Sequence, residues 1–240
     1  MTLRVADIWR YPVKSLQGER LDQAEIDHLG LTGDRRYAII DLETGLGLTG
    51  RRVPELLFAS ASWNDDGSVR VTLPHGSAAS DDRTLSAWLR RRVALRHCQD
   101  VAERRYENVV AYEVESTSEW TTFEGASGPF HDSYQARVSL VSTATIGELD
   151  RRRFRPILVL EGAGEDDLIG SRVRVGSSVM NVTGGIQRCV MVTRPQPGGI
   201  ERDLDVLRRI CRLRNCRLAV GALVEVPGAV SIGDEVTIVA

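Results

Sequence analysis

Lysine is almost absent from this chain. Of its 240 residues, 31 are Lys or Arg, and 30 of these are Arg, so Lys14 is the single lysine. This bias indicates an arginine-favouring, GC-rich coding background. In that background a lone lysine is either retained by chance or required at a position that needs a compact ammonium instead of a planar guanidinium. Composition leaves both interpretations open.

The chain also lacks a large net charge, a long apolar run and a hydrophobic leader. Its net charge is −2, whereas polyanion binders are normally basic, so we expect no nucleic-acid partner. No apolar run approaches the length of a membrane span, and the first ten residues contain no secretory signal. We therefore expect a protein of the bacterial cytoplasm with no membrane partner.

Cysteine is scarce as well. The chain has 4 cysteines, and none of them forms a Cys-x-x-Cys pair: Cys98, Cys189, Cys211 and Cys216. Four cysteines in a chain of this length do not indicate a disulfide scaffold, and no matching His/Cys set accompanies Cys211 and Cys216. We expect reduced thiols and no zinc site.

Short runs of β-branched or alternating apolar residues, separated by glycine-containing turns, predict a mainly β protein of the α+β class, built as a small barrel or sandwich. Strands are expected at residues 3–10, 36–41, 56–63, 69–73, 136–142, 157–161, 172–175, 178–182 and 236–239. A hairpin turn is expected at 64–67.

Few helices interrupt this pattern. Helical spacing of apolar residues predicts helices at 81–93, 143–152 and 204–213, the second capped by Ser142 or Thr143. A change from helix to new strands near 95–100 divides the chain into domains 1–98 and 99–240. Because no Pro/Gly/Ser-rich linker separates them, we expect the two parts to pack together.

The first half contains two cation motifs. In the segment Tyr11 to Ser15, Lys14 stands beside Ser15, and an ammonium next to a hydroxyl suits a phosphate or another oxyanion; the alternative is a solvated loop lysine. Arg35 follows a two-glycine turn and Arg51 follows Gly50, and either guanidinium could bind a phosphate. An exposed Asp–Arg pair is the alternative for Arg35.

The second half places an arginine and a cysteine in unusual settings. Arg155, between an aromatic residue and a proline, is the better candidate for an inward-facing charge that needs an anionic partner. Cys189 follows a Gly-Gly pair and adjoins Arg188, whose charge favours a thiolate. A thiolate is a soft metal ligand or a nucleophile that can carry sulfur. An inert buried cysteine is the alternative.

Together these residues suit a phosphate-bearing cofactor whose reactive end takes a thiolate. The sequence has no Ser-His-Asp signature, no Walker loop and no dinucleotide glycine motif after a strand.

At this level of detail the chain resembles a known family. Motifs in its first half resemble the β-barrel domain that precedes MOSC domains: Tyr11-Pro12-Val13-Lys14-Ser15, Gly33-Asp34-Arg35 and Thr49-Gly50-Arg51. Motifs in its second half resemble the MOSC domain itself: Phe130-His131-Asp132, Ser142-Thr143-Ala144-Thr145, Phe154-Arg155-Pro156, Glu165-Asp166, Gln187-Arg188-Cys189 and Val230-Ser231-Ile232-Gly233-Asp234.

The resemblance implies a MOSC β-barrel domain packed with a small N-terminal β-barrel domain, and binding of the molybdenum cofactor (molybdopterin). In the amidoxime reducing component family a Cys thiolate ligates molybdenum, which by resemblance is Cys189. The remaining cofactor-binding residues would be Lys14, Ser15, Arg35, Arg51, Ser142, Thr143, Arg155 and Arg188. Family members reduce N-hydroxylated substrates, in a reaction that consumes two electrons and two protons and releases water.

Two features depart from the family pattern. Ile157 follows Pro156 where relatives usually carry Asn, and the stretch between Glu161 and Arg172 is short, so access of substrate is expected to differ. Some bacterial relatives carry a C-terminal ferredoxin domain, but this chain ends at Ala240 without its Cys set. The resemblance therefore implies a separate electron-transfer protein, of ferredoxin or cytochrome type.

Three functions remain open from the sequence. The first is a molybdenum-dependent reductase of small N-oxygenated compounds. The second is a sulfur carrier or sulfurtransferase with Cys189 as a persulfide. The third is a binding module without catalysis, in which Cys189 is inert. Metal content separates the first from the others.

Overall fold

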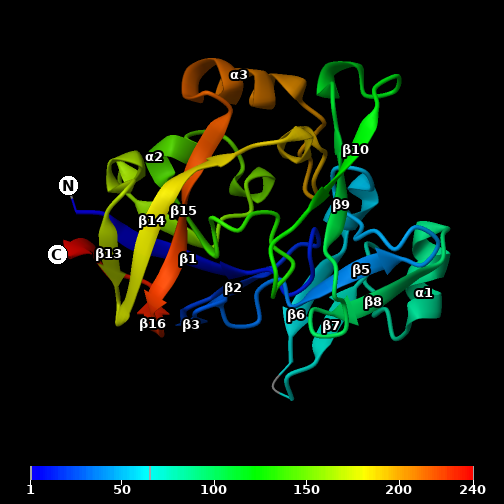
Figure 1. Cartoon of the computed structure of the whole chain (residues 1–240), viewed down its shortest axis with the longest axis horizontal. Helices are drawn as coiled ribbons and strands as arrows, with labels where there is room; N and C mark the ends of the chain where they lie inside the picture. Colours follow the sequence, from blue (N-terminus) through cyan, green and yellow to red (C-terminus); the bar gives the residue numbers. More distant parts are fainter. Residues whose placement is uncertain (1, 65, 240) are drawn as a thin grey trace.

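The structure is a computed structural model, and it describes residues 2–64 and 66–239. The chain is mainly β, as the sequence predicts, and its largest sheet is a curled, eight-stranded half-barrel (Figure 1). In spatial order this sheet contains β17 (Val236–Val239), β13 (Arg172–Val175), β14 (Ser178–Gln187), β15 (Arg217–Val226), β11 (Val138–Ser142), β12 (Leu158–Glu161), β1 (Arg4–Arg10) and β2 (Glu19–Leu21).

The smaller sheets lie beside it. They are β16 (Gly228–Ser231) with β3 (Gln23–Asp27) and β4 (Gly30–Leu31), β5 (Tyr37–Asp41) with β8 (Val93–His97), β6 (Ser60–Trp63) with β7 (Val69–Thr72), and β9 (Arg105–Val109) with β10 (Trp120–Glu124). The α-helices are α1 (Asp82–Leu89), α2 (Thr143–Ile146) and α3 (Leu204–Arg214). Short 3₁₀ turns are η1 (Pro54–Phe58), η2 (Tyr112–Val114), η3 (Arg151–Arg153), η4 (Glu165–Leu168) and η5 (Val190–Thr193).

The large sheet takes strands from both halves of the chain. β1 pairs antiparallel with β12, and β3 pairs antiparallel with β16, so the first 31 residues complete a core that is otherwise formed by residues beyond 137. A second core fills the space between β5, β8, η1 and α1. A third lies under α3, where apolar residues of that helix meet Val192 and Phe154. β1 thus leads the chain directly from the first core into the second.

Several predicted elements differ from the observed ones. The helix expected at 143–152 is one turn, α2, because Gly147 adopts a positive φ of 59° and ends it. The strand expected from residue 56 begins at Ser60, because Pro54 starts the turn η1. The hairpin β6–β7 is confirmed, although Asp65 in its turn lies outside the described residues.

The expectation of four reduced thiols was wrong for one pair. Cys211 and Cys216 form a disulfide, while Cys98 and Cys189 are free. The pairing arises because Asn215 and Cys216 both adopt left-handed backbone conformations, which turn the chain back onto the last turn of α3. No helix within residues 2–64 and 66–239 is long and apolar enough to cross a membrane.

Candidate functional site

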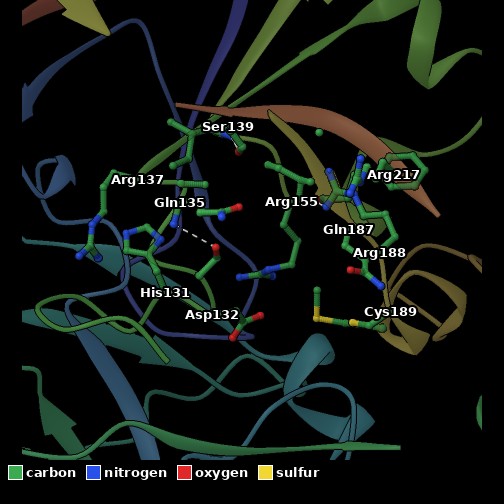
Figure 2. A pocket seen from close by; sticks show the side chains of 18 of the residues that line it. His131, Asp132, Gln135, Arg137, Ser139, Arg155, Gln187, Arg188, Cys189 and Arg217 are labelled. Carbon is green, nitrogen blue, oxygen red and sulfur yellow. Dashed lines mark hydrogen bonds between the residues drawn. The ribbon is translucent and has the colours of Figure 1, made fainter. Parts of the chain in front are cut away.

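A cavity of about 470 Å³ lies where the two halves of the chain meet (Figure 2). It brings together seven of the nine site residues predicted from the sequence: Lys14, Ser15, Arg35, Arg51, Arg155, Arg188 and Cys189. The first four come from loops of the first half, and the other three come from the second half. The loops after β1 and before β5 are therefore placed against the end of β14 by the packing of the two halves.

Ser142 and Thr143 are the two predicted site residues that the structure places elsewhere. The Ser142 hydroxyl accepts a hydrogen bond of 3.1 Å from the backbone N–H of Thr145 and caps α2. Thr143 Oγ1 accepts a hydrogen bond of 3.2 Å from the Gly162 backbone N–H. Neither side chain lines the cavity.

Cys189 lies between the end of β14 and η5, in an extended conformation, and its half-buried side chain lines the cavity. Its Sγ accepts a hydrogen bond of 3.1 Å from Nε of Arg51. The sequence suggests Arg188 as the charge on this sulfur, but the Arg188 guanidinium donates to two backbone carbonyls instead, those of Leu218 at 2.8 Å and Phe154 at 3.0 Å. The hydrogen-bonding partner of the thiol thus comes from the other half of the chain.

Arg51 and Lys14 share one carboxylate. Both side chains are buried, and each forms an ion pair with Asp132, whose own side chain is 41% exposed. Lys14 Nζ also donates to the backbone carbonyl of Phe130 at 2.9 Å and lies 4.0 Å from the centre of the Tyr106 ring. These contacts fix the single lysine of the chain at the wall of the cavity.

The charged groups in this cluster shift one another's pKa values. Burial lowers the pKa of Lys14 to about 8, although the carboxylate of Asp132 acts in the opposite direction. Burial alone would raise the pKa of Asp132, but the charges of Arg51 and Lys14 outweigh it and hold that pKa well below its usual range. Asp132 is therefore ionised at neutral pH, while Lys14 begins to lose its proton in mildly alkaline solution.

Three site residues have left-handed backbone conformations. Ser15, Arg35 and Arg155 have φ values of 69°, 50° and 50°, which L-residues rarely adopt. Each is held by a hydrogen bond: the Ser15 hydroxyl accepts from the Gly50 N–H at 2.9 Å, the Arg35 N–H donates to the Tyr11 carbonyl at 2.8 Å, and the Arg155 N–H donates to the Arg151 carbonyl at 3.1 Å. The Arg35 guanidinium also pairs with buried Asp34. Strain of this kind is common where side chains are aimed at a ligand.

Arg155 is the buried cation that the sequence predicts. Its side chain is 4% exposed, and burial lowers its pKa to about 10. Nη1 lies 3.4 Å from the Ser15 carbonyl, and the guanidinium stacks 4.2 Å from the centre of the Tyr11 ring. Nη2 of Arg155 and Nη2 of Arg188 are buried and have no hydrogen-bond partner in the part of the chain that the structure describes. Such nitrogens favour an anionic ligand.

Sequence reasoning missed several residues of the site. Asp132 was visible only as part of a family motif, and its role as shared counter-ion was not predicted. Arg137 and Arg217 also line the cavity, but nothing local separates them from the other arginines of the chain. Only the strand pairing of β14 with β15 brings Arg217 to the cavity.

Comparisons with known proteins identify the two domains of the chain. The MOSC N-terminal beta barrel domain matches residues 2–114, and the MOSC domain matches residues 99–237. The chain belongs to the MOSC domain family. The resemblance drawn from the motifs is thereby confirmed.

Relatives of this MOSC domain protein include two kinds of molybdenum-related enzyme. It is 26% identical to mitochondrial amidoxime reducing component 2 of Bos taurus over 86% of this chain and 72% of the relative. It is 25% identical to molybdenum cofactor sulfurase of Drosophila grimshawi over 88% of this chain but 30% of that relative. A solved structure, the YuaD protein of Bacillus subtilis, aligns at TM-score 0.45 and 12% identity over 98% of this chain and 94% of that one.

Proposed function

We propose that this MOSC domain protein is a molybdenum-cofactor-dependent reductase of small N-oxygenated compounds that receives electrons from a separate protein of ferredoxin or cytochrome type. Two facts support an enzyme of this kind: the similarity to amidoxime reducing components, and a cavity that contains a free cysteine and several arginines. The cofactor, the substrate class and the electron donor are all part of the proposal.

The single observation that carries the proposal is the setting of Cys189. Its Sγ lines a cavity large enough for a small cofactor, and Arg51 holds it from the opposite half of the chain. The buried, unpartnered Nη2 of Arg155 suits an anionic group such as a phosphate, and thiolate sulfur is a soft metal ligand. The residues present therefore fit a phosphate-bearing molybdenum cofactor.

Each residue then has a task. Lys14, Ser15, Arg35 and Arg155 would hold the phosphate and the polar edges of the pterin, and Cys189 would ligate the metal. When bound, the cofactor would supply two electrons to the N–O bond of the substrate. Arg51 would keep Sγ in place through its 3.1 Å hydrogen bond, and Asp132 would keep Arg51 in place. With two protons, the N–O bond would be replaced by an N–H bond, so that a hydroxylamine gives the amine, an amidoxime gives the amidine, and each releases water.

Metal and pterin analysis tests this proposal. Protein purified from a host that makes the cofactor is expected to contain about one molybdenum and one pterin per chain. Cys189→Ser is expected to lose the metal. The matched control is Cys98→Ser, because Cys98 is also a free cysteine but is buried away from the cavity. Wild-type protein that contains neither molybdenum nor pterin would overturn the proposal.

A second candidate is a sulfur carrier with a persulfide on Cys189. The similarity to molybdenum cofactor sulfurase and the free thiol of Cys189 favour it. Mass spectrometry separates the two candidates, because a sulfane adduct on Cys189 in protein that contains no molybdenum supports the carrier, whereas molybdenum without the adduct supports the reductase.

A further inference from the structure

The mouth of the cavity has its own cationic residue on the Cys189 side. Arg217, at the start of β15, is exposed and lines the cavity, and it pairs in register with Gln187 at the end of β14. Figure 2 shows Gln187, Arg188 and Arg217 grouped on one side, with Cys189 below them. A group bound here would lie next to the sulfur.

The strand beneath Arg217 is shaped to receive its side chain. A Cβ placed on Gly185 would lie 3.1 Å from Cδ of Arg217 and 3.2 Å from its Cβ, which is tighter than ordinary contact. Glycine at this position therefore allows the aliphatic part of Arg217 to lie flat against β14, along the wall of the cavity. Thus the arginine is supported by the sheet instead of extending freely into solvent.

The cavity has more positive charge than the phosphate of one cofactor needs. Seven cationic side chains and one carboxylate line it: Lys14, Arg35, Arg51, Arg137, Arg155, Arg188 and Arg217, with Asp132. The last four of these cations have no carboxylate partner among the described residues. A single phosphate monoester carries roughly two negative charges. Positive charge therefore remains beyond what the phosphate alone neutralises.

The unpaired cations are also separated in space. Arg155 lies in the middle of the cavity in Figure 2, near the loops that contain Lys14 and Ser15, whereas Arg188 and Arg217 lie on the Cys189 side. Arg155 is nine-tenths buried with an unpartnered Nη2, and Arg188 has a buried, unpartnered Nη2 of its own. The two unpartnered nitrogens therefore belong to two different side chains, one held against the Ser15 carbonyl and the other against the Leu218 and Phe154 carbonyls.

We propose that the mouth formed by Gln187, Arg188 and Arg217 receives an anionic group of the substrate, so that this chain selects N-oxygenated compounds that also carry a carboxylate or a phosphate. The inference rests on the reductase function proposed above and names its substrate class. A guanidinium fork binds either anion bidentately, and Gln187 adds an amide donor. The reducible nitrogen of such a substrate is then held beside Cys189.

Paired substrates test this specificity. Loaded enzyme, with reduced methyl viologen as electron donor, is given benzamidoxime, 4-carboxybenzamidoxime and 4-phosphonooxybenzamidoxime. We expect kcat/KM to be about tenfold higher for the two anionic substrates than for benzamidoxime, mainly because their KM is lower. In Arg217→Gln the ratio of kcat/KM between anionic and neutral substrates should fall to about one. Whichever anionic substrate has the larger advantage identifies the natural anion. The control is Arg209→Gln, an exposed arginine of α3 that does not line the cavity.

Calorimetry on the cofactor-free chain gives a second readout that does not depend on turnover. 4-Carboxybenzamidine is expected to bind about tenfold more tightly than benzamidine, and Arg217→Gln removes the difference. Equal kcat/KM for charged and neutral substrates, or loss of molybdenum from Arg217→Gln, would overturn the inference, the latter by showing that Arg217 holds the cofactor. If no amidoxime is reduced at all, the proposed function fails. The calorimetry then shows by itself whether the mouth binds an anionic group through Arg217.

Discussion

The two halves of the chain hold their cavity-lining cations in different ways. Lys14, Arg35 and Arg51 from the first half each have a carboxylate partner, whereas Arg155 and Arg188 from the second half donate, among the described residues, only to backbone carbonyls. Paired buried charges keep their geometry without a ligand, but unpaired ones cost free energy until a ligand arrives. The cations of the first half are therefore already neutralised, whereas those of the second half favour binding of an anion.

Removal of an unpaired cation is expected to have the largest effect. In Arg155→Met the methionine keeps most of the side-chain volume but removes the buried charge. Molybdenum and pterin content should fall to below about a tenth of wild type, while the urea midpoint of the cofactor-free chain should not fall, because an unpaired buried charge has been removed. Arg70→Met, at an exposed site on β7, is the control. A large loss of stability in the cofactor-free variant would show that Arg155 stabilises the empty chain, and would contradict the contrast between paired and unpaired cations.

Removal of a paired cation should instead destabilise the empty chain. Arg51→Met leaves Asp132 with one cationic partner and removes the donor to Cys189 Sγ. Since Asp132 is partly exposed, we expect a loss of about 1–2 kcal/mol in the free energy of unfolding, measured with urea. Arg52→Met is the matched control, because Arg52 is the next residue, is exposed, and lies 3.7 Å from the half-buried Glu107. Equal effects of the two variants would contradict the expectation.

The pH dependence of anion binding tests the lysine. Because burial lowers the pKa of Lys14 to about 8, most of its charge is present at pH 7 and most is lost at pH 9. Affinity of the cofactor-free chain for sulfate, whose own charge is constant here, should fall severalfold between pH 7 and pH 9. Lys14→Arg should bind more weakly at pH 7, because a planar fork does not replace an ammonium, but should show no such decline. A parallel decline in both proteins would exclude Lys14 as its source.

The smallest expected effect concerns Ser142. Ser142→Ala removes the cap of α2 and should cost about 1 kcal/mol in the free energy of unfolding, measured with urea. Thr145→Ala, which keeps the capped N–H, is the control. Molybdenum content of the same variant then decides whether Ser142 also serves the cofactor: a loss would indicate a role beyond capping, and an unchanged content would indicate capping alone.

The strands and the site differ in how much of them the sequence predicts. Short strands such as β13 and β7 are predicted because their apolar residues alternate and turns flank them. β15 is not predicted, because residues Leu218 to Ala222 are all buried. Their sequence therefore lacks the alternation of apolar and polar residues that indicates a strand. The hairpin β9–β10 falls in a segment of weak pattern and is seen only once it pairs.

The site is predicted through residue types and family motifs, but its contacts are not. Arg188 adjoins Cys189 in the sequence, yet the hydrogen bond to Sγ comes from Arg51, which is 138 positions away. Local reasoning cannot find such a pair, because the direction of a side chain is set by the turn after β14 and by the packing of both halves. The disulfide of Cys211 was missed for a similar reason, since two left-handed residues were needed to close it.

The path of β1 has a consequence for folding. Residues 4–10 belong to the core of the large sheet, and a few residues later Val13 and Leu16 lie in the core beneath α1. The site residues Lys14 and Ser15 occupy this short crossing between two cores. A ligand that joins Lys14 to Arg155 would therefore stabilise both cores together, and the loaded chain should unfold at a higher urea concentration than the empty chain.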